Sequence, residues 1–249
     1  MIDIHTHILF GIDDGAKTLE DSLALIDMQL EQGVHTIVLT PHYNPLKQDL
    51  DAFIELRDKN CQILKQAILE THRDITILKG AEVLYSSKLF EMNLEDLVIE
   101  NTDYILIEFS PRTLPSNLMN QISELIGMGY IPIIAHMERY PYFKDNLDLP
   151  IDLMKCGVLM QVNASSFIDQ SQSSFIHACM RHGWIHCIAS DVHSIDKRPS
   201  NMIKAKQAIK EKHPKLWNTW MVNVKQVLEN EIISVQQPSK IRSFLGKYI

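Results

Sequence analysis

The chain has 249 residues, 45% of them hydrophobic, and this length suits one α/β barrel better than two small domains. Its formal net charge of −7 argues against a protein that binds nucleic acid, because such proteins usually present a basic surface. The N-terminal segment lacks the basic and apolar regions of a signal peptide, and no stretch approaches the roughly 20 apolar residues of a membrane span. We therefore expect a cytoplasmic protein with one hydrophobic core.

Seven apolar runs rich in β-branched residues predict strands, and helical patterns lie between most of them. The predicted strands cover residues 2–7, 36–40, 75–83, 104–109, 131–135, 158–162 and 185–189. Thr18 and Asp21 resemble a capping box at the start of the first helix, and Gly33 ends it. Later helical segments also end in a glycine just before a strand, at Gly129, Gly157 and Gly183.

Apolar strands that alternate with helices indicate a parallel sheet covered by helices. Seven such units predict a closed or nearly closed α/β barrel, with a doubly wound open sheet as the alternative. The absence of an internal repeat or low-complexity linker favours a single domain over residues 1–233. Residues 234–249 carry Lys240, Arg242 and Lys247 and no acid, which predicts a basic C-terminal tail or an extension that faces a partner.

Residue types that bind metals gather where the predicted strands end. His5 and His7 end the first strand, and side chains two apart on a strand point the same way. Further ligand types stand at or just after later strand ends, at His42, Glu82, Glu108, His136, Asp191 and His193. Because the C-terminal ends of barrel strands converge on one face, these side chains are expected to meet. A single histidine could be an ordinary core residue, but burying the whole set without ions would be costly.

The turn Asp13-Asp14-Gly15 follows the first strand and has two interpretations. Asp-Asp-Gly is ordinary turn chemistry, but the nearby ligands favour Asp14 as a further metal ligand. The set contains only nitrogen and oxygen donors, which suit Mn, Fe or Zn. It is too large for one ion, so we expect two or three divalent ions that share a bridging carboxylate, roughly 3.5–4 Å apart. This pattern predicts a metal-dependent phosphoesterase.

Two other chemistries lack their motifs. A cysteine-based phosphatase needs an arginine six positions after its cysteine, and none of the four cysteines has one: Cys61, Cys156, Cys179 and Cys187. Their spacing also fits no zinc ribbon, so we expect reduced thiols. Neither GxGxxG nor GxxxxGK[ST] occurs, which removes the usual nucleotide-binding loops.

At these residues the chain resembles the PHP family, and within it the protein-tyrosine phosphatases found with bacterial capsule and exopolysaccharide genes. The matching segments run through nearly the whole chain in the family order: MIDIHTHIL, DDGAKTLEDS, TIVLTPHYN, GAEV, YILIEF, IPIIAHMERY, QVNASS and IASDVHSIDKRPS. The resemblance implies an incomplete (β/α)7 TIM-like barrel of the PHP type. It also implies a phosphatase whose metal-activated hydroxide attacks phosphotyrosine on a tyrosine kinase that regulates polysaccharide export, with the tyrosine-rich tail of that kinase as the partner.

The resemblance further implies how the ligands divide among three ions. His5, His7, Glu82 and Asp191 would hold the first. Glu82 would bridge to a second ion, bound also by Glu108 and His136. The third would be held by Asp14, His42 and His193.

Two arginines are expected to bind the phosphate. Arg139 lies three positions after His136, and Arg198 lies five positions after His193, so both loops start at the predicted catalytic face. A guanidinium offers a planar fork that matches two phosphate oxygens. The alternative is a pair of surface arginines bound to nearby acids.

Four other functions remain open from the sequence, and the least favoured of them is a metal-dependent deaminase on a similar barrel. A PHP phosphatase of small molecules, such as histidinol phosphate, shares the ligand pattern, although the segments HMERY and SDVHSIDKRPS favour the capsule branch. A non-catalytic PHP regulatory module would keep the barrel, but the full ligand set argues against a decayed site. A PHP nuclease fits poorly with the acidic charge.

Overall fold

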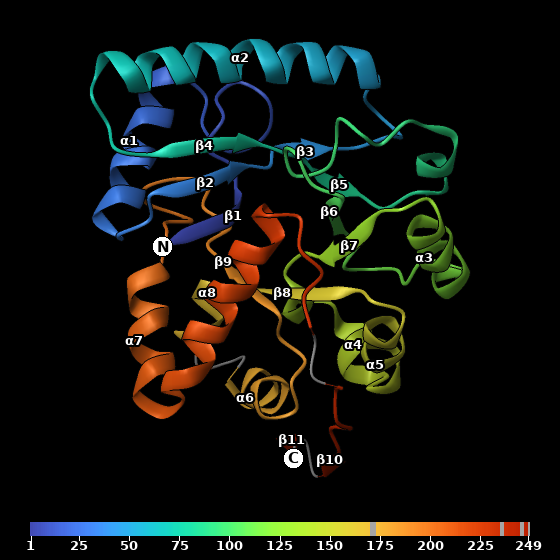
Figure 1. Ribbon diagram of the computed structural model, residues 1–249. Coiled ribbons are helices and arrows are strands. Elements are labelled where there is room, and N and C mark those ends of the chain that lie inside the picture. The colour runs from blue at the N-terminus through green and yellow to red at the C-terminus, as the bar shows by residue number, and fades with distance from the viewer. Residues whose placement is uncertain (170–172, 235–236, 245–246, 249) are drawn as a thin grey trace.

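The computed structural model describes residues 1–169, 173–234, 237–244 and 247–248 (Figure 1). Parallel strands form its centre, with helices around them. The strands are β1 (Ile2–Thr6), β2 (Thr36–Leu39), β3 (His42–Tyr43), β4 (Thr76–Lys79), β5 (Glu82–Leu84), β6 (Tyr104–Glu108), β7 (Ile131–Ile134), β8 (Leu159–Asn163), β9 (Cys187–Ala189), β10 (Ser243–Phe244) and β11 (Lys247–Tyr248).

The helices connect most of these strands and pack on their outer side. They are α1 (Leu19–Glu31), α2 (Leu50–Glu70), α3 (Leu118–Gly127), α4 (Pro141–Asp145), α5 (Asp148–Lys155), α6 (Ser173–Arg181), α7 (Met202–Lys212) and α8 (Pro214–Leu228). Three 3-10 turns accompany them, η1 (Ser87–Glu91), η2 (Met137–Arg139) and η3 (Ala164–Phe167). Between β5 and β6 the short η1 stands where a full α-helix would complete the pattern.

Every neighbouring pair of central strands is parallel, which confirms the predicted α/β class. One sheet has the order β1-β2-β4 and the other the order β3-β5-β6-β7-β8-β9. A parallel bridge between Thr6 and Val192 joins β1 to the segment just after β9. The first and last strands of the series therefore lie side by side, and the open doubly wound alternative does not describe this arrangement.

Two predicted strands are interrupted in the middle. The predicted strand 36–40 continues past Pro41 as β3, and the predicted strand 75–83 divides into β4 and β5 around Gly80. Pro41 has no N–H to donate to a ladder, but its carbonyl accepts from Glu82 N at 3.1 Å. A Cβ on Gly80 would lie 3.1 Å from Val38 Cγ1, so glycine permits the close approach of β2 and β4 there.

The predicted helix signals are confirmed. Thr18 accepts a hydrogen bond from Asp21 N, and the Asp21 side chain accepts one from Thr18 N, which forms the complete capping box of α1. Four glycines past helix ends have positive φ angles, between 72 and 99°, at Gly33, Gly129, Gly157 and Gly183. The four cysteines are free thiols.

A cluster of buried apolar side chains lies among the strands. It includes Val38, Leu106, Ile133 and Leu159, each buried, and Val224 of α8. Helix α8 packs against β1 and β9 (Figure 1). Ligand-type side chains occupy the C-terminal ends of the strands, and this apolar layer supports them.

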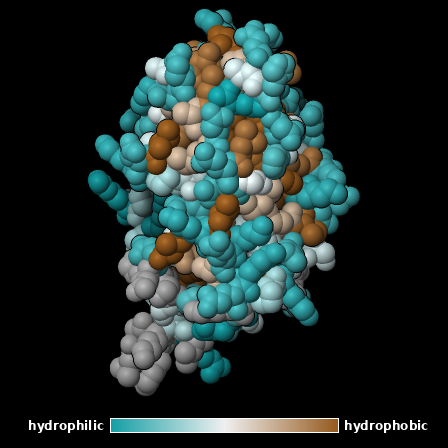
Figure 2. All heavy atoms as spheres, turned by 90° about the vertical axis from the view of Figure 1, so that its left-hand side faces the viewer, coloured by the Kyte–Doolittle hydropathy of each residue, from teal (hydrophilic) through white to brown (hydrophobic). Residues whose placement is uncertain are grey.

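The outer surface is mostly hydrophilic. On the side formed by α1 and α7, polar residues surround scattered apolar ones (Figure 2). No helix in the described part of the chain is both long and apolar enough to cross a membrane.

Candidate metal centre

Four ligand-type side chains from three strand ends meet at one point. His5 Nε2 and His7 Nε2 of β1 lie 3.2 Å apart, and each is 3.1 Å from Glu82 Oε2 of β5. Asp191 Oδ1, two residues past β9, is 3.5 Å from His5 Nε2 and 3.4 Å from His7 Nε2. All four side chains are buried. One ion can contact a donor atom from each of them.

The donor chemistry of this cluster fits a metal. Among the described side chains, four buried atoms in the ligand set make no hydrogen bond: Glu82 Oε2, Asp191 Oδ1, His42 Nδ1 and His193 Nε2. A buried polar atom without a partner is costly, so such atoms are rare and call for an explanation. Their position around a shared centre indicates that cations complete the site.

A second group lies on the other side of Glu82. His42 Nδ1 is 3.1 Å from Glu82 Oε2 and 3.3 Å from Glu108 Oε1. His136 Nε2 is 2.7 Å from Glu82 Oε1 and 3.9 Å from Glu108 Oε2. Glu82 therefore faces both groups: Oε2 lies near His5, His7 and His42, and Oε1 lies near His136, which is the position of a bridging ligand.

A third group includes the exposed carboxylate of Asp14. Asp14 Oδ1 lies 3.5 Å from His42 Nε2 and 3.4 Å from His193 Nε2. His7 belongs to this group as well, and its ring centroid lies 3.7 Å from that of His193, with the two rings tilted by 30°. Asp14 stands at the open edge, with 66% of its side chain exposed.

The three groups overlap more than the sequence indicated. The resemblance divided the histidines cleanly, but His42 lies within reach of both the second and third groups, and His7 of both the first and third. All nine predicted ligands nevertheless lie in this one cluster.

Two of the ligand-type residues have unusual backbone conformations. His136 follows β7 with a φ of 33°, and Asp191 follows β9 with a φ of 55°. Residues with a side chain rarely adopt this left-handed region, and such strain is concentrated at functional sites. In both cases the turn directs the side chain back into the cluster.

Asp13 is a functional residue that the sequence argument did not single out. His7 Nδ1 donates to Asp13 Oδ2 at 2.6 Å, and the same carboxylate accepts from Gly15 N and His42 N. Burial would raise the pKa of Asp13, but the His7 contact and these amides hold it well below its usual range. A carboxylate behind a histidine fixes which nitrogen faces the metal. The signal was present, since Asp13 precedes Asp14 in the same turn.

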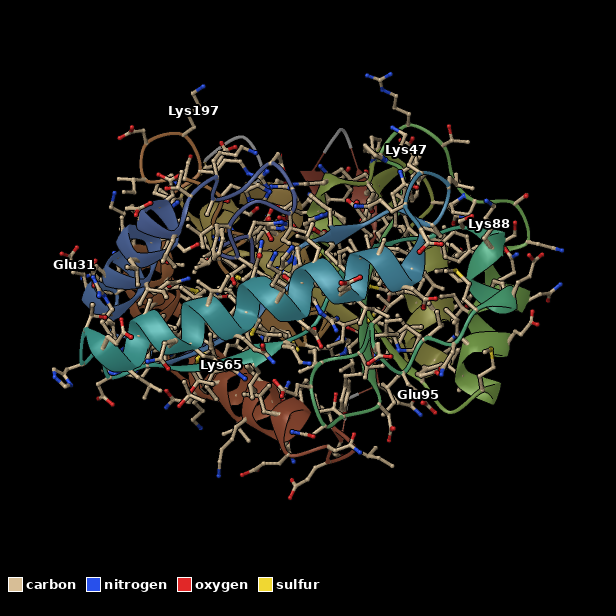
Figure 3. All side chains as sticks on the ribbon, turned by 90° about the horizontal axis from the view of Figure 1, so that it is seen from above. Glu31, Lys47, Lys65, Lys88, Glu95 and Lys197 are labelled. Carbon is tan, nitrogen blue, oxygen red and sulfur yellow. The ribbon has the colours of Figure 1, made fainter. Side chains whose placement is uncertain are left out.

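Arg139 and Arg198 both reach the cluster, as predicted. Arg139 Nη2 lies 2.8 Å and Arg198 Nη2 lies 2.7 Å from Asp191 Oδ2. Each remains partly exposed, so its other N–H groups are available to a ligand. By contrast, the neighbouring Lys197 points away from the protein into solvent (Figure 3). Charge alone would not distinguish Lys197 from Arg198, because both side chains are cationic.

A cavity of about 180 Å³ opens beside the second group. Its lining combines ligand-type residues, both arginines and an apolar wall: His42, Glu82, Glu108, Phe109, Pro111, His136, Arg139, Tyr140 and Arg198. Tyr140 OH lies 3.2 Å from His136 Nδ1 and accepts from Phe109 N at 2.9 Å, which braces this wall. An anion in this cavity would meet the guanidiniums of both arginines and an apolar surface.

Comparison with known proteins identifies the family. The family model for capsular polysaccharide synthesis, CpsB/CapC, matches residues 1–229. The chain belongs to the CpsB/CapC family. Among relatives in this family, the tyrosine-protein phosphatase CpsB of Streptococcus agalactiae is 32% identical over 94% of this chain and all of that protein. The tyrosine-protein phosphatase YwqE of Bacillus subtilis is 31% identical over 99% of both chains.

Solved structures give the same picture. A structure described as YwqE from Bacillus subtilis and CpsB from Streptococcus pneumoniae, metal-dependent tyrosine phosphatases, matches with a TM-score of 0.89 and 28% identity over 98% of this chain and all of that one. The histidinol phosphate phosphatase of Lactococcus lactis shares only the fold, with a TM-score of 0.55 and 13% identity over 84% of this chain and 92% of that one. The resemblance seen in the sequence motifs is thereby confirmed.

Proposed function

We propose that this member of the CpsB/CapC family is a metal-dependent protein-tyrosine phosphatase. The observation that carries the proposal is the buried His, Asp and Glu cluster, whose unpartnered donor atoms surround a shared centre beside two arginines. The relatives named above as tyrosine phosphatases support the substrate class.

The ligands of the ions are assigned as follows. His5, His7, Glu82 and Asp191 would hold the first ion, and Glu82 would be shared with a second ion held by Glu108 and His136. Asp14, His42 and His193 would hold a third. The nitrogen and oxygen donors favour Mn, with Fe or Zn as alternatives. Bound divalent ions lower the pKa of water and neutralise charge on phosphate oxygens, which makes hydroxide available at neutral pH.

The protein's own residues bind and orient the substrate. Arg139 ends η2 and Arg198 lies in the segment after β9, and both guanidiniums lie beside Asp191 Oδ2, where each can also donate to phosphate oxygens. Phe109 and Pro111 form the apolar side of the cavity next to them, a surface suited to a phenyl ring. Tyrosine has a pKa near 10 in solution, so its phenolate leaves more readily than an alkoxide.

The natural substrate in this proposal is a phosphotyrosine-bearing protein of the cytoplasm, namely the tail of a tyrosine kinase that regulates capsule or exopolysaccharide synthesis. The family description places such proteins in capsular polysaccharide synthesis. The relatives' names specify tyrosine phosphatases but no kinase, so the kinase follows from the sequence resemblance alone.

The substrate class is tested with the purified protein and Mn²⁺ on three substrates: a phosphotyrosine peptide, the same peptide with phosphoserine, and histidinol phosphate. We expect kcat/KM to be highest for phosphotyrosine by at least tenfold. A preference for histidinol phosphate would instead identify a small-molecule phosphatase. Turnover of none of the three, in protein that retains its ions, would favour a regulatory module.

Replacing Arg139 or Arg198 by alanine should lower kcat/KM by about a hundredfold. Each change removes a donor to the transferring phosphoryl group, a loss of a few kcal/mol in transition-state stabilisation. Metal content, measured by elemental analysis, should stay at the wild-type level because the ligands are intact.

Arg73→Ala is the matched control for the arginine variants. Arg73→Ala also removes a contact between an arginine and a carboxylate, since Arg73 Nε lies 2.7 Å from Asp27 Oδ1. Arg73 lies far from the cluster, in the loop before β4. It should lower stability slightly and leave kcat/KM unchanged. Wild-type kcat/KM in both Arg139→Ala and Arg198→Ala would show that neither arginine binds the phosphate.

We also propose that residues 1–233 form an incomplete (β/α)7 TIM-like barrel of the PHP type. The support is the parallel order of the central strands and the Thr6–Val192 bridge that brings the first and last of them together. The short turn η1 replaces one expected helix. The count of seven treats β2 with β3, and β4 with β5, as single interrupted strands.

The segment 234–249 is proposed to be a basic tail that serves partner docking or localisation; residues 235–236, 245–246 and 249 lie outside its described part. The described part packs on the barrel. Ser239 N donates to His182 O, Trp184 Nε1 donates to Ser239 O at 2.9 Å, and Ile241 is buried. Lys240 pairs with Asp148 of α5 at 2.7 Å.

Deleting residues 234–249 should leave turnover of a small aryl phosphate unchanged, because the metal cluster lies at the opposite ends of the strands. It should lower the melting temperature by roughly 5–10 °C, since Ile241 and the Trp184 bond contribute about 2–3 kcal/mol. Both quantities are measured on the same preparation. A large loss of turnover at a temperature where the variant is folded would show that the segment belongs to the site.

A further inference from the structure

Strand β8 contributes none of the proposed metal ligands, yet its polar residues point into the cluster. Gln161 and Asn163 stand two apart, so their side chains lie on the same face of the strand. Both are completely or almost completely buried. Burial of two amides costs free energy unless all their donors and acceptors are used, so their partners carry information.

The two amides form a continuous chain of hydrogen bonds. His5 Nδ1 lies 3.2 Å from Gln161 Oε1, and Gln161 Nε2 donates to Asn163 Oδ1 at 2.9 Å. Asn163 Nδ2 then donates to Asp191 Oδ2 at 2.7 Å. This series of hydrogen bonds therefore begins at His5 and ends at Asp191, two proposed ligands of the first ion that lie 186 positions apart in the sequence.

The orientation of both amides is fixed at the two ends. The backbone N–H of His136 can only donate, and it lies 2.8 Å from Gln161 Oε1, so that atom must be the oxygen. Asp191 Oδ2 lies 2.8 Å from Arg139 Nη2 and 2.7 Å from Arg198 Nη2, and a guanidinium can only donate, so this oxygen is an acceptor. The atom of Asn163 that faces it must therefore be the nitrogen.

This orientation determines the state of His5. Because Gln161 presents an oxygen, His5 Nδ1 must carry a proton and donate it. The lone pair of the neutral ring is then on Nε2, the nitrogen that faces Glu82 and Asp191 in the first group. At the other end, Asn163 joins the two arginines on Asp191 Oδ2 and leaves Oδ1, an atom without a hydrogen bond, toward the cluster.

We propose that Gln161 and Asn163 act together as a positioning relay for the first metal ion. The relay sets the His5 tautomer and selects the Asp191 oxygen that binds the ion. It deepens the proposed function and rests on the ligand assignment made there. A carboxylate or amide behind a metal ligand typically changes metal affinity by about 10–100-fold.

The test measures Zn²⁺ binding by competition with a chelating dye, with wild-type protein, Gln161→Leu, Asn163→Leu and the double variant. Each single change should raise the Kd of one bound Zn²⁺ ion by about 10–100-fold. In the double variant, the rise in Kd should be smaller than the product of the two single rises, because the residues act as one unit. NMR of the Zn²⁺-loaded protein should show a slowly exchanging Nδ1 proton on His5 that is lost in Gln161→Leu.

Gln29→Leu provides the matched control. Gln29 is an equally buried glutamine, with bonds to Asp3 at 2.7 Å and Ser200 at 3.1 Å, but it contacts no proposed ligand. It should lower the melting temperature without changing Zn²⁺ affinity. If Gln161→Leu fails to fold, Asn163→Leu alone still tests the relay.

Two failures are distinguishable. Wild-type protein that binds no Zn²⁺ or Mn²⁺ would overturn the proposed metal centre itself. Wild-type protein that binds ions, with unchanged affinity in both Gln161→Leu and Asn163→Leu, would overturn only the relay.

Discussion

Removing bound metal with EDTA is expected to abolish hydrolysis of phosphotyrosine peptides, with a loss of at least about a thousandfold. None of the four cysteines belongs to the ligand groups or lines the cavity beside them, so no thiol is placed to act instead. Burial raises the pKa of Cys187 to about 12 and that of Cys179 well above its usual value, so both remain protonated at neutral pH. Activity therefore depends on the nucleophile that the ions supply.

Adding Mn²⁺ back after dialysis should restore the rate, and elemental analysis should follow the metal at each step. Mg²⁺ provides a useful comparison, because it prefers oxygen ligands and fits the histidine-rich groups poorly. Full turnover in protein shown to be free of metal would rule out the proposed chemistry.

Glu82→Ala is expected to be the most damaging single substitution. Glu82 Oε2 faces His5, His7 and His42, and its other oxygen is 2.7 Å from His136 Nε2. Its loss removes the shared ligand of two ions and leaves four histidines without their common anion. Turnover should fall by roughly a thousandfold or more, with a corresponding loss of bound metal.

The matched control is Glu55→Ala on the exposed surface of α2, which should leave metal content and turnover unchanged. His213→Ala should also be nearly silent, since His213 lies outside the cluster. Glu82→Gln separates shape from charge, because it keeps the size of the side chain but not its anionic character. Wild-type turnover and metal content in Glu82→Ala would show that the bridging assignment is wrong.

The geometry that the metal cluster needs at the strand ends lowers the stability of the protein without metal. His136 and Asp191 keep left-handed backbones that a side chain normally avoids, and both direct donor atoms into the cluster. Buried atoms such as Glu82 Oε2 and Asp191 Oδ1 remain without hydrogen bonds. These features cost stability in the protein alone, so metal binding should raise the melting temperature, in proportion to how tightly the folded state binds.

Much of the architecture was predictable from the sequence. Apolar strands alternating with helices require a parallel sheet, and parallel strands direct their C-terminal ends to one edge. For that reason the residue types after each strand predicted one cluster, and all nine predicted ligands lie in it. Arg139 and Arg198 were also predictable, because their loops start at the same edge.

Only the tertiary structure decided how these residues are used. Pro41 and Gly80 interrupt two strands that periodicity reads as continuous, because a missing N–H and a close strand approach leave no trace in an apolar pattern. The overlap of His7 and His42 between ion groups depends on strand stagger and ring rotation.

The supporting residues depend even more on the folded geometry. Gln161 and Asn163 are not strong ligand types, and Asp13 stands in an Asp-Asp-Gly turn, where aspartate is also ordinary turn chemistry. Their roles arise from hydrogen bonds of 2.6–3.2 Å to His5, His7 and Asp191. The sequence by itself determined which ligand-type residues and which two arginines arrive at the site. The packed barrel determined which atom of each residue faces the metal, because hydrogen-bond direction is set by distances across strands that are remote in the chain.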